Sequence, residues 1–129
     1  MDETLATERV IRVLIVDDEP LFRLGIAMML AEDERLEFVL SEADDGEAGL
    51  ARIAAEKPEV VLLDLNMPRL DGHAALRQIK QRWPDIRVIV LTSSDSVEDR
   101  RRAEQTGVDA FVEKRHADTQ LPALIASLN

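Results

Sequence analysis

The sequence predicts an α/β fold in which five parallel strands form a doubly wound sheet covered by helices on both faces. Three short runs, Val10–Val16, Val60–Leu63 and Val88–Leu91, are almost wholly apolar and rich in β-branched residues. A strand covered on one face alternates in polarity, so continuous apolar runs indicate strands that are buried on both faces. Two weaker strands fit at Phe38–Ala43 and Ala110–Glu113, and helical patterns separate all five.

The first helical pattern follows the first strand. Pro20 suits a first helical position, because the N–H that proline lacks has no partner within the helix there. Four apolar residues then follow on one face, with the spacing of a helix that packs an apolar stripe. They are Leu21, Leu24, Met28 and Met29.

The other helices are marked by their caps and by apolar spacing. The second opens at Asp45 or Gly46, and the third follows the N-cap Asp71 and ends at Pro84. The spaced apolar residues are Leu50, Ile53 and Ala54 in the second helix and Ala75, Leu76, Ile79 and Trp83, facing inward, in the third. The last two predicted helices are Val97–Thr106, capped by Gly107, and Leu121–Leu128.

Composition narrows the function classes. The chain has 129 residues, a usual size for one domain, and no cysteine, which excludes disulfides, thiolate metal sites and cysteine nucleophiles. Its net charge of −10 disfavours nucleic acid as a direct partner. No apolar run approaches a membrane span, and residues 1–9 lack the apolar core of a secretory signal. We therefore expect a cytoplasmic protein without a membrane partner, with residues 1–9 as a flexible lead and 10–129 as one domain.

Polar residues follow the predicted strands at the points where the strands end. The carboxyl ends of parallel strands meet at one edge of the sheet, and ligands of doubly wound folds bind there. We therefore expect these side chains to converge. They are Asp17, Asp18 and Glu19 after the first strand, Asp64 after the third, Thr92 after the fourth and Lys114 after the fifth.

This set of side chains suits phosphoryl transfer. Clustered carboxylates resist joint ionisation unless a cation neutralises them, and magnesium binds through one or two carboxylates plus phosphate oxygens. Lys114 adds a positive charge, and Thr92 adds a hydrogen bond for an oxygen that arrives later. Because phosphoryl transfer depends on positioning and charge neutralisation, Asp64 is a candidate nucleophile that would form an acyl phosphate.

Four stretches, VLIVDDEP, VVLLDLNMPRLDG, VIVLTSS and AFVEK, resemble the motifs of bacterial two-component receiver domains, the CheY-like domains of response regulators. They occur in the family's order across nearly the whole chain. The resemblance implies that residues 10–129 form a receiver domain with a flavodoxin-like sheet of strand order 2-1-3-4-5. The segment DDEPLFRLGI also resembles receivers of the NarL/FixJ kind, which are attached to helix-turn-helix output domains.

The resemblance also implies a role for each matching residue. The chain would accept a phosphoryl group with the help of Mg²⁺ or Mn²⁺ and then change the shape of one face. Asn66 and Ser94 each lie two positions past a site residue, and we expect them to help set the lifetime of the phosphorylated state. The resemblance implies that Asp64 is the phosphoacceptor and that Lys114 pairs with a phosphoryl oxygen. The implied metal ligands are Asp18 directly, Asp17 through water, Asp64, and the backbone carbonyl of Asn66. Thr92 would be the switch hydroxyl and Phe111 the switch aromatic residue.

Partners follow from the same resemblance. The phosphoryl donor would be a histidine kinase or a phosphotransfer protein. The face formed by the fourth helix, the fifth strand and the last helix would bind an output domain or a second copy of the chain. The basic run Arg100–Arg102 fits a solvated helix face or a patch that docks a partner.

One position departs from the family pattern. The family lysine is usually followed by a proline in a cis peptide, whereas Arg115 follows Lys114 here. A cis bond before a residue other than proline costs about 2.5–4 kcal/mol, so we expect a trans bond and a reshaped loop. The polar tract Arg115–Gln120 and Pro122 predict a short last helix.

Three other functions stay open. An aspartyl-phosphate hydrolase usually needs a second acid two residues after the nucleophile, and position 66 is asparagine. A flavin carrier needs a phosphate loop rich in Ser, Thr and Gly after the first strand, where this chain has the acidic DDEPLF. A docking module that works without phosphorylation is compatible with the departure at Arg115.

Overall fold

Strands and helices alternate along the chain in the computed structural model, which describes residues 10–34, 36–67, 69–93 and 96–128. The predicted lead over residues 1–9 and Ser94 lie outside these ranges. None of the described helices has both the length and the apolar character needed to cross a bilayer. The strands are β1 Val10–Val16, β2 Glu37–Ala43, β3 Val60–Asp64, β4 Arg87–Thr92 and β5 Ala110–Glu113. The helices are α2 Pro20–Ala31, α3 Gly46–Glu56, α4 Gly72–Arg82, α5 Val97–Thr106, the 3-10 turn η1 Lys114–His116 and α6 Ala117–Leu128.

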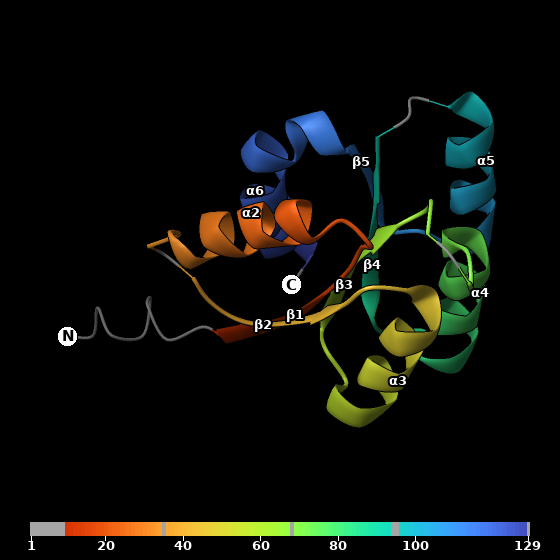
Figure 1. Ribbon diagram of the computed structural model, residues 1–129, viewed down its shortest axis with the longest axis horizontal. Helices are drawn as coiled ribbons and strands as arrows, with labels where there is room; N and C mark the ends of the chain where they lie inside the picture. The colour runs from red at the N-terminus through yellow and green to blue at the C-terminus, as the bar shows by residue number, and fades with distance from the viewer. Residues whose placement is uncertain (1–9, 35, 68, 94–95, 129) are drawn as a thin grey trace.

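The five strands form one parallel sheet in the order β2-β1-β3-β4-β5. Figure 1 shows α2 and α6 on one face of this sheet and α3, α4 and α5 on the other. The predicted doubly wound α/β fold is therefore confirmed, including the order 2-1-3-4-5. Each strand begins and ends within one residue of its predicted bounds.

Side chains of the central strands alternate between two apolar cores. Leu14 and Val16 of β1 join the core under α3, α4 and α5, whereas Val13 and Ile15 join the core under α2 and α6. All five residues of β3 are buried. Because both faces of the sheet are covered, these strands need apolar residues at consecutive positions, which explains their unbroken apolar runs.

Three predicted caps are confirmed. The Asp45 side chain accepts a hydrogen bond from the Ala48 amide at 2.8 Å, and that of Asp71 accepts one from the Ala74 amide at 2.9 Å. Each bond satisfies an N–H that has no partner within the helix. Gly107 ends α5 with φ +99°, a left-handed conformation that glycine adopts without a steric penalty.

The face that α2 packs was predicted wrongly. Three of the four residues on the predicted face are exposed, and Ile26 and Leu30 are buried in their place. The helix reads PLFRLGIAMMLA and carries one charge, so its apolar residues lie on every side and their spacing cannot select one face. The exposed residues are Leu21, Leu24 and Met28, while Met29 is half-buried. In α3, Ala54 was predicted to be one of the spaced apolar residues, and it is also exposed.

The last helix is longer than predicted. It begins at Ala117 and continues from η1, and Pro122 lies inside it. Proline removes one intrahelical hydrogen bond. However, Ala117, Leu121 and Ile125 are spaced by four residues and are all buried. Burial of this stripe against the sheet offsets the missing bond, so the helix extends across the proline.

Candidate functional site

Three carboxylates from two neighbouring strand ends lie close together. Asp17 and Asp18 follow β1, and Asp64 is the last residue of β3, which pairs with β1 in parallel. One oxygen of each carboxylate lies within 4.8 Å of the others. Asp17 is 0% exposed and Asp64 is 3% exposed, whereas Asp18 is exposed. The cluster is therefore buried on its inner side and open to solvent at Asp18.

Lys114 brings a positive charge into this cluster. Its Nζ lies 2.7 Å from Oδ2 of Asp17 and 3.6 Å from Oδ2 of Asp64. A third carboxylate, that of Glu19, lies 2.5 Å from the same nitrogen. The ammonium group thus neutralises part of the negative charge, and it is closest to the acids that follow β1.

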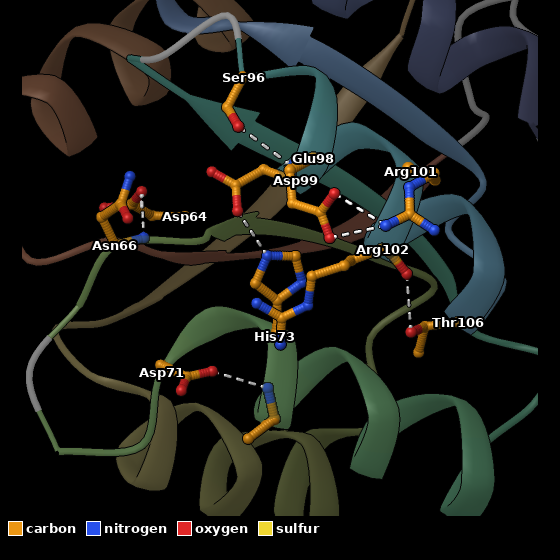
Figure 2. Close-up of polar contacts among 11 residues, drawn as sticks. Asp64, Asn66, Asp71, His73, Ser96, Glu98, Asp99, Arg101, Arg102 and Thr106 are labelled. Atoms are coloured by element: carbon orange, nitrogen blue, oxygen red, sulfur yellow. Dashed lines mark hydrogen bonds and ion pairs between the residues drawn. The ribbon is translucent and has the colours of Figure 1, made fainter.

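Backbone amides hold the two buried carboxylates in place. Asp17 Oδ1 accepts a hydrogen bond from the Glu19 amide at 2.7 Å, and Asp64 Oδ1 accepts one from the Asn66 amide at 3.1 Å. Figure 2 shows the second of these bonds at the end of β3. Both link a side chain to the amide two residues later, as in an Asx turn. The carboxylate orientations are therefore set by the local chain.

Gly72 lets α4 begin directly beside Asp64. A Cβ at this position would lie 2.5 Å from the Asp64 carbonyl oxygen and 2.3 Å from the Leu65 Cα. Both neighbours are backbone atoms, which cannot rotate away. The Gly72 amide also donates to the Leu65 carbonyl at 3.0 Å. The segment after Asp64 is therefore packed against the start of α4 at a distance that only glycine allows.

Burial governs the protonation of the two inner carboxylates. It raises the pKa of Asp64 to about 6; the Asn66 amide partly opposes this rise, and the charge of Asp17 adds to it. Burial also raises the pKa of Asp17, against the hydrogen bond from Lys114. For Lys114, burial alone would lower the pKa, but its hydrogen bonds with Asp17 and Glu19 outweigh burial and raise it.

The two predicted switch residues lie on β4 and β5. Thr92 ends β4 and is wholly buried, one residue beyond Leu91, which pairs with Asp64 in the strand register. Phe111 of β5 is partly buried, and the Arg100 guanidinium lies 4.5 Å from the centre of its ring. Arg100 therefore has a specific contact within the fold.

The donor atoms of the cluster fit a hard divalent cation. The three carboxylates offer oxygen ligands, which Mg²⁺ and Mn²⁺ prefer. Lys114 supplies one positive charge against these three carboxylates, so a divalent cation would relieve the repulsion that remains among them. Asn66 follows Asp64 by two residues and is exposed, and its amide donates to the Asp64 carboxylate.

The expected trans peptide bond after Lys114 is observed. The described residues contain no cis peptide bond, and a 3-10 turn begins at Lys114 itself. The Arg115 side chain is largely exposed and donates to Glu113 at 2.7 Å. Lys114 nevertheless reaches the acid cluster, so the loss of the proline does not turn it away.

Glu19 was among the side chains expected to meet Lys114 at this edge of the sheet, and the two are in contact. Sequence reasoning missed two other contacts near this site. Phe22 lies with its ring centre 4.5 Å from the Lys114 nitrogen. His73 of α4 bonds to Asp99 of α5 at 3.0 Å. No spacing rule links such pairs, because each contact joins elements that are distant in sequence.

Comparison with known proteins agrees with the fold and with the motifs. The family model described as the response regulator receiver domain matches residues 13–126. The chain is 34% identical over 118 residues to the transcriptional regulatory protein DegU of Brevibacillus brevis, covering 91% of this chain and 50% of that protein. It is 40% identical over 104 residues to the response regulator GacA of Pseudomonas aeruginosa, covering 81% and 48%.

Solved structures give the same result. The signal receiver domain of NarL from Mycobacterium tuberculosis superposes with a TM-score of 0.83 at 32% identity, covering 92% of this chain and 95% of that one. The isolated receiver domain of RcsB from Salmonella enterica serovar Typhimurium gives 0.83 at 28% identity, covering 93% and 88%. The chain spans about half the length of the curated relatives it matches. It belongs to the receiver domain family of two-component response regulators.

Proposed function

We propose that this receiver domain is a phosphorylation switch in which Asp64 accepts a phosphoryl group and partners read the result. One observation carries the proposal: the carboxylate at the end of β3 lies among two further carboxylates and the ammonium group of Lys114. Such a site can neutralise the charge of an incoming phosphoryl group. The chain acts as the acceptor in this reaction and does not turn over a separate substrate.

The transfer step forms one bond and breaks one bond. An oxygen of ionised Asp64 attacks the donor phosphorus and makes an acyl phosphate, while the donor atom leaves with the electron pair of the broken bond. The Asn66 amide holds the carboxylate in a fixed orientation for this attack. Lys114 pairs with a phosphoryl oxygen, and the Thr92 hydroxyl donates to another.

A divalent cation completes the proposed site. Asp18 and Asp64 would hold it directly, Asp17 through water, and the Asn66 backbone carbonyl would be a further ligand. When bound, Mg²⁺ or Mn²⁺ neutralises the phosphoryl oxygens and the crowded carboxylates. The exposed side of the cluster at Asp18 gives this cation access from solvent.

The output of the switch is proposed to lie on the face formed by α5, β5 and α6. Thr92 precedes α5, and Phe111 lies on β5, so a movement of Thr92 toward the phosphoryl group would act on both. Arg100 contacts the Phe111 ring from α5 and would follow its movement. An output domain or a second copy of the chain would bind the changed face.

The proposed donor is a histidine kinase or a phosphotransfer protein in the cytoplasm. DNA is not a proposed partner of this domain, because its net charge of −10 repels phosphates. The response regulator RcsB has been solved on promoter DNA with the phosphate mimic BeF₃⁻. Any DNA contact of a longer regulator containing this chain would come from another domain.

Mass spectrometry with acetyl phosphate and MgCl₂ tests the proposal. We expect the wild-type chain to gain the mass of one phosphoryl group in MgCl₂. When EDTA replaces magnesium during the labelling, this gain in mass should be absent. Asp64→Asn should not be labelled. Asp44→Asn, which changes an exposed acid before α3, is the matched control and should be labelled like the wild type.

Full labelling of Asp64→Asn would refute the role of Asp64. Labelling of the wild type that does not depend on a divalent cation would refute the proposed metal site. Repeated hydrolysis of small phosphate esters would favour an enzyme over a switch.

A further inference from the structure

We propose that Phe22 is a positioning residue for Lys114, with its ring face closing the pocket behind the ammonium group. This inference rests on the proposed function, because it concerns how Lys114 is aimed at the phosphoryl site. Phe22 has no role in the family pattern described above. It adds an aromatic ring beside an ammonium group whose other neighbours are carboxylates.

The ammonium group of Lys114 is enclosed. Three carboxylate oxygens lie within 3.6 Å of Nζ, and the ring centre of Phe22 lies 4.5 Å from it. The Lys114 side chain is only 11% exposed. The face of an aromatic ring carries partial negative charge and attracts a cation, most strongly where water is excluded. The ring therefore takes the place of water on the side of the ammonium group that does not face a carboxylate.

The fold fixes the ring itself. Phe22 is partly buried and packs against the core between the sheet, α2 and α6. It lies in the first turn of α2, directly after the acidic run. The Arg23 amide donates to the Glu19 carbonyl at 3.1 Å, and the Arg23 guanidinium donates to the Asp17 carbonyl. One short segment thus supplies both the acids and the aromatic ring.

Because Arg115 replaces the family's proline, Lys114 needs another contact to hold its side chain in place. Arg115 stands where the family has proline, so no proline ring restrains the chain after Lys114. The Arg115 side chain is largely exposed and donates to Glu113 at 2.7 Å. A lysine side chain has four rotatable bonds, and contacts at its far end are what restrict them. Phe22 restrains that end from the first helix.

Nuclear magnetic resonance tests the contact directly. Protons above an aromatic ring shift upfield, so the Lys114 Cε protons, identified by their loss in Lys114→Gln, should be shifted in the wild type. Phe22→Leu should abolish the shift, and Phe22→Tyr, which keeps the ring, should retain it. Equal Lys114 shifts in the wild type and Phe22→Leu would overturn the proposal.

Kinetics test the positioning role. With acetyl phosphate at saturating MgCl₂, we expect Phe22→Leu to lower the rate of Asp64 phosphorylation by roughly five- to tenfold, whereas Phe22→Tyr stays within about twofold. Phe38→Leu is the matched control. It makes the same change at another partly buried phenylalanine of this core, on β2, and should leave the rate unchanged.

Each outcome has one meaning. An unchanged rate in Phe22→Leu, or an equal loss in Phe38→Leu, would overturn the positioning role. A wild-type chain that is never phosphorylated would refute the proposed function instead, and the ring shift would still report whether Phe22 holds Lys114. Circular dichroism of each variant, recorded before the rates, should give the wild-type spectrum.

Discussion

Asp64 is a carboxylate held in an environment that opposes its charge. It is 3% exposed and accepts one amide hydrogen bond, and Asp17 lies beside it. Burial is the largest cause of its raised pKa of about 6. The proposed attack on phosphorus needs the ionised form, so the reactive residue is also one that the fold accommodates at a cost in stability.

The metal-free protein should become less stable as the pH rises through the interval between about 4 and 6. The pKa of Asp64 is about 6 in the folded chain and 3.8 without the fold, so the folded state binds more protons in this interval. Stability therefore falls with rising pH, by about 3 kcal/mol at most from this residue. Asp17 titrates in the same direction, so the effect of Asp64 is isolated by comparison with Asp64→Asn.

At pH 7.5 in EDTA, Asp64→Asn should accordingly be more stable than the wild type, and this difference should shrink toward pH 4. Urea denaturation at several pH values measures the free energy of unfolding of both proteins. A variant that is less stable than the wild type at pH 7.5 would show that the ionised carboxylate stabilises the fold.

At the scale of elements, a partly buried pair joins the helices that follow β3 and β4. His73 of α4 is 8% exposed, and its Nε2 lies 3.0 Å from Oδ1 of Asp99 in α5. Figure 2 shows this bond crossing between the two helices. The helix α4 follows Asp64, and α5 follows Thr92. The pair therefore links the segment after Asp64, the proposed phosphoacceptor, to the segment after Thr92, the proposed switch hydroxyl.

Removal of the Asp99 carboxylate should destabilise the fold by about 1–3 kcal/mol, because the buried His73 nitrogen would lose its partner. Glu98→Ala is the matched control for Asp99→Ala. Both acids lie in the first turn of α5, but Glu98 pairs with Arg101 at the surface, where both side chains are more than half exposed. Glu98→Ala should lower the free energy of unfolding by less than about 1 kcal/mol. Chemical denaturation of both variants would measure the difference, and equal losses would contradict the role of the pair.

Elements differ in how well the sequence predicts them. The strands were predicted to within one residue, because burial on both faces leaves a continuous apolar signal. The packed face of α2 was predicted wrongly, because the helix is apolar on every side. Only the tertiary fold determines that Leu30 is buried and Leu24 is exposed. The start of α6 was placed at Leu121 because Pro122 indicates a helix boundary. The helix begins at Ala117 instead, because this residue is buried, and its burial depends on how the whole chain packs.

At the scale of the whole molecule, the strand order brings the site together. Four parallel strands deliver their carboxyl ends to one edge, which is why residues as distant as Asp17 and Lys114 were predicted to meet. The same reasoning could not reveal Phe22 or the His73–Asp99 pair. Those contacts depend on the helices as they pack, and helix packing leaves no fixed spacing in the sequence.

Because the proposed metal ligands converge only in the folded chain, magnesium should stabilise the fold as a ligand of the native state. The expected gain is RT ln(1 + [Mg²⁺]/Kd), about 2.7 kcal/mol at one hundred times Kd. The melting temperature should therefore rise with MgCl₂. It should rise less at pH 5, because protons compete for Asp64, whose pKa is about 6.

Salt alone also stabilises a chain of net charge −10 by screening its repulsion, so the effect must be separated from ionic strength. NaCl at equal ionic strength gives that baseline. Asp18→Asn should abolish the additional rise with MgCl₂, because Asp18 is the exposed acid of the cluster and its loss leaves the core intact. Glu104→Gln removes one exposed charge from α5, away from the three clustered acids, and should keep the rise. Equal melting curves in MgCl₂ and NaCl, or an equal loss in both variants, would show that magnesium acts on this chain only as a salt.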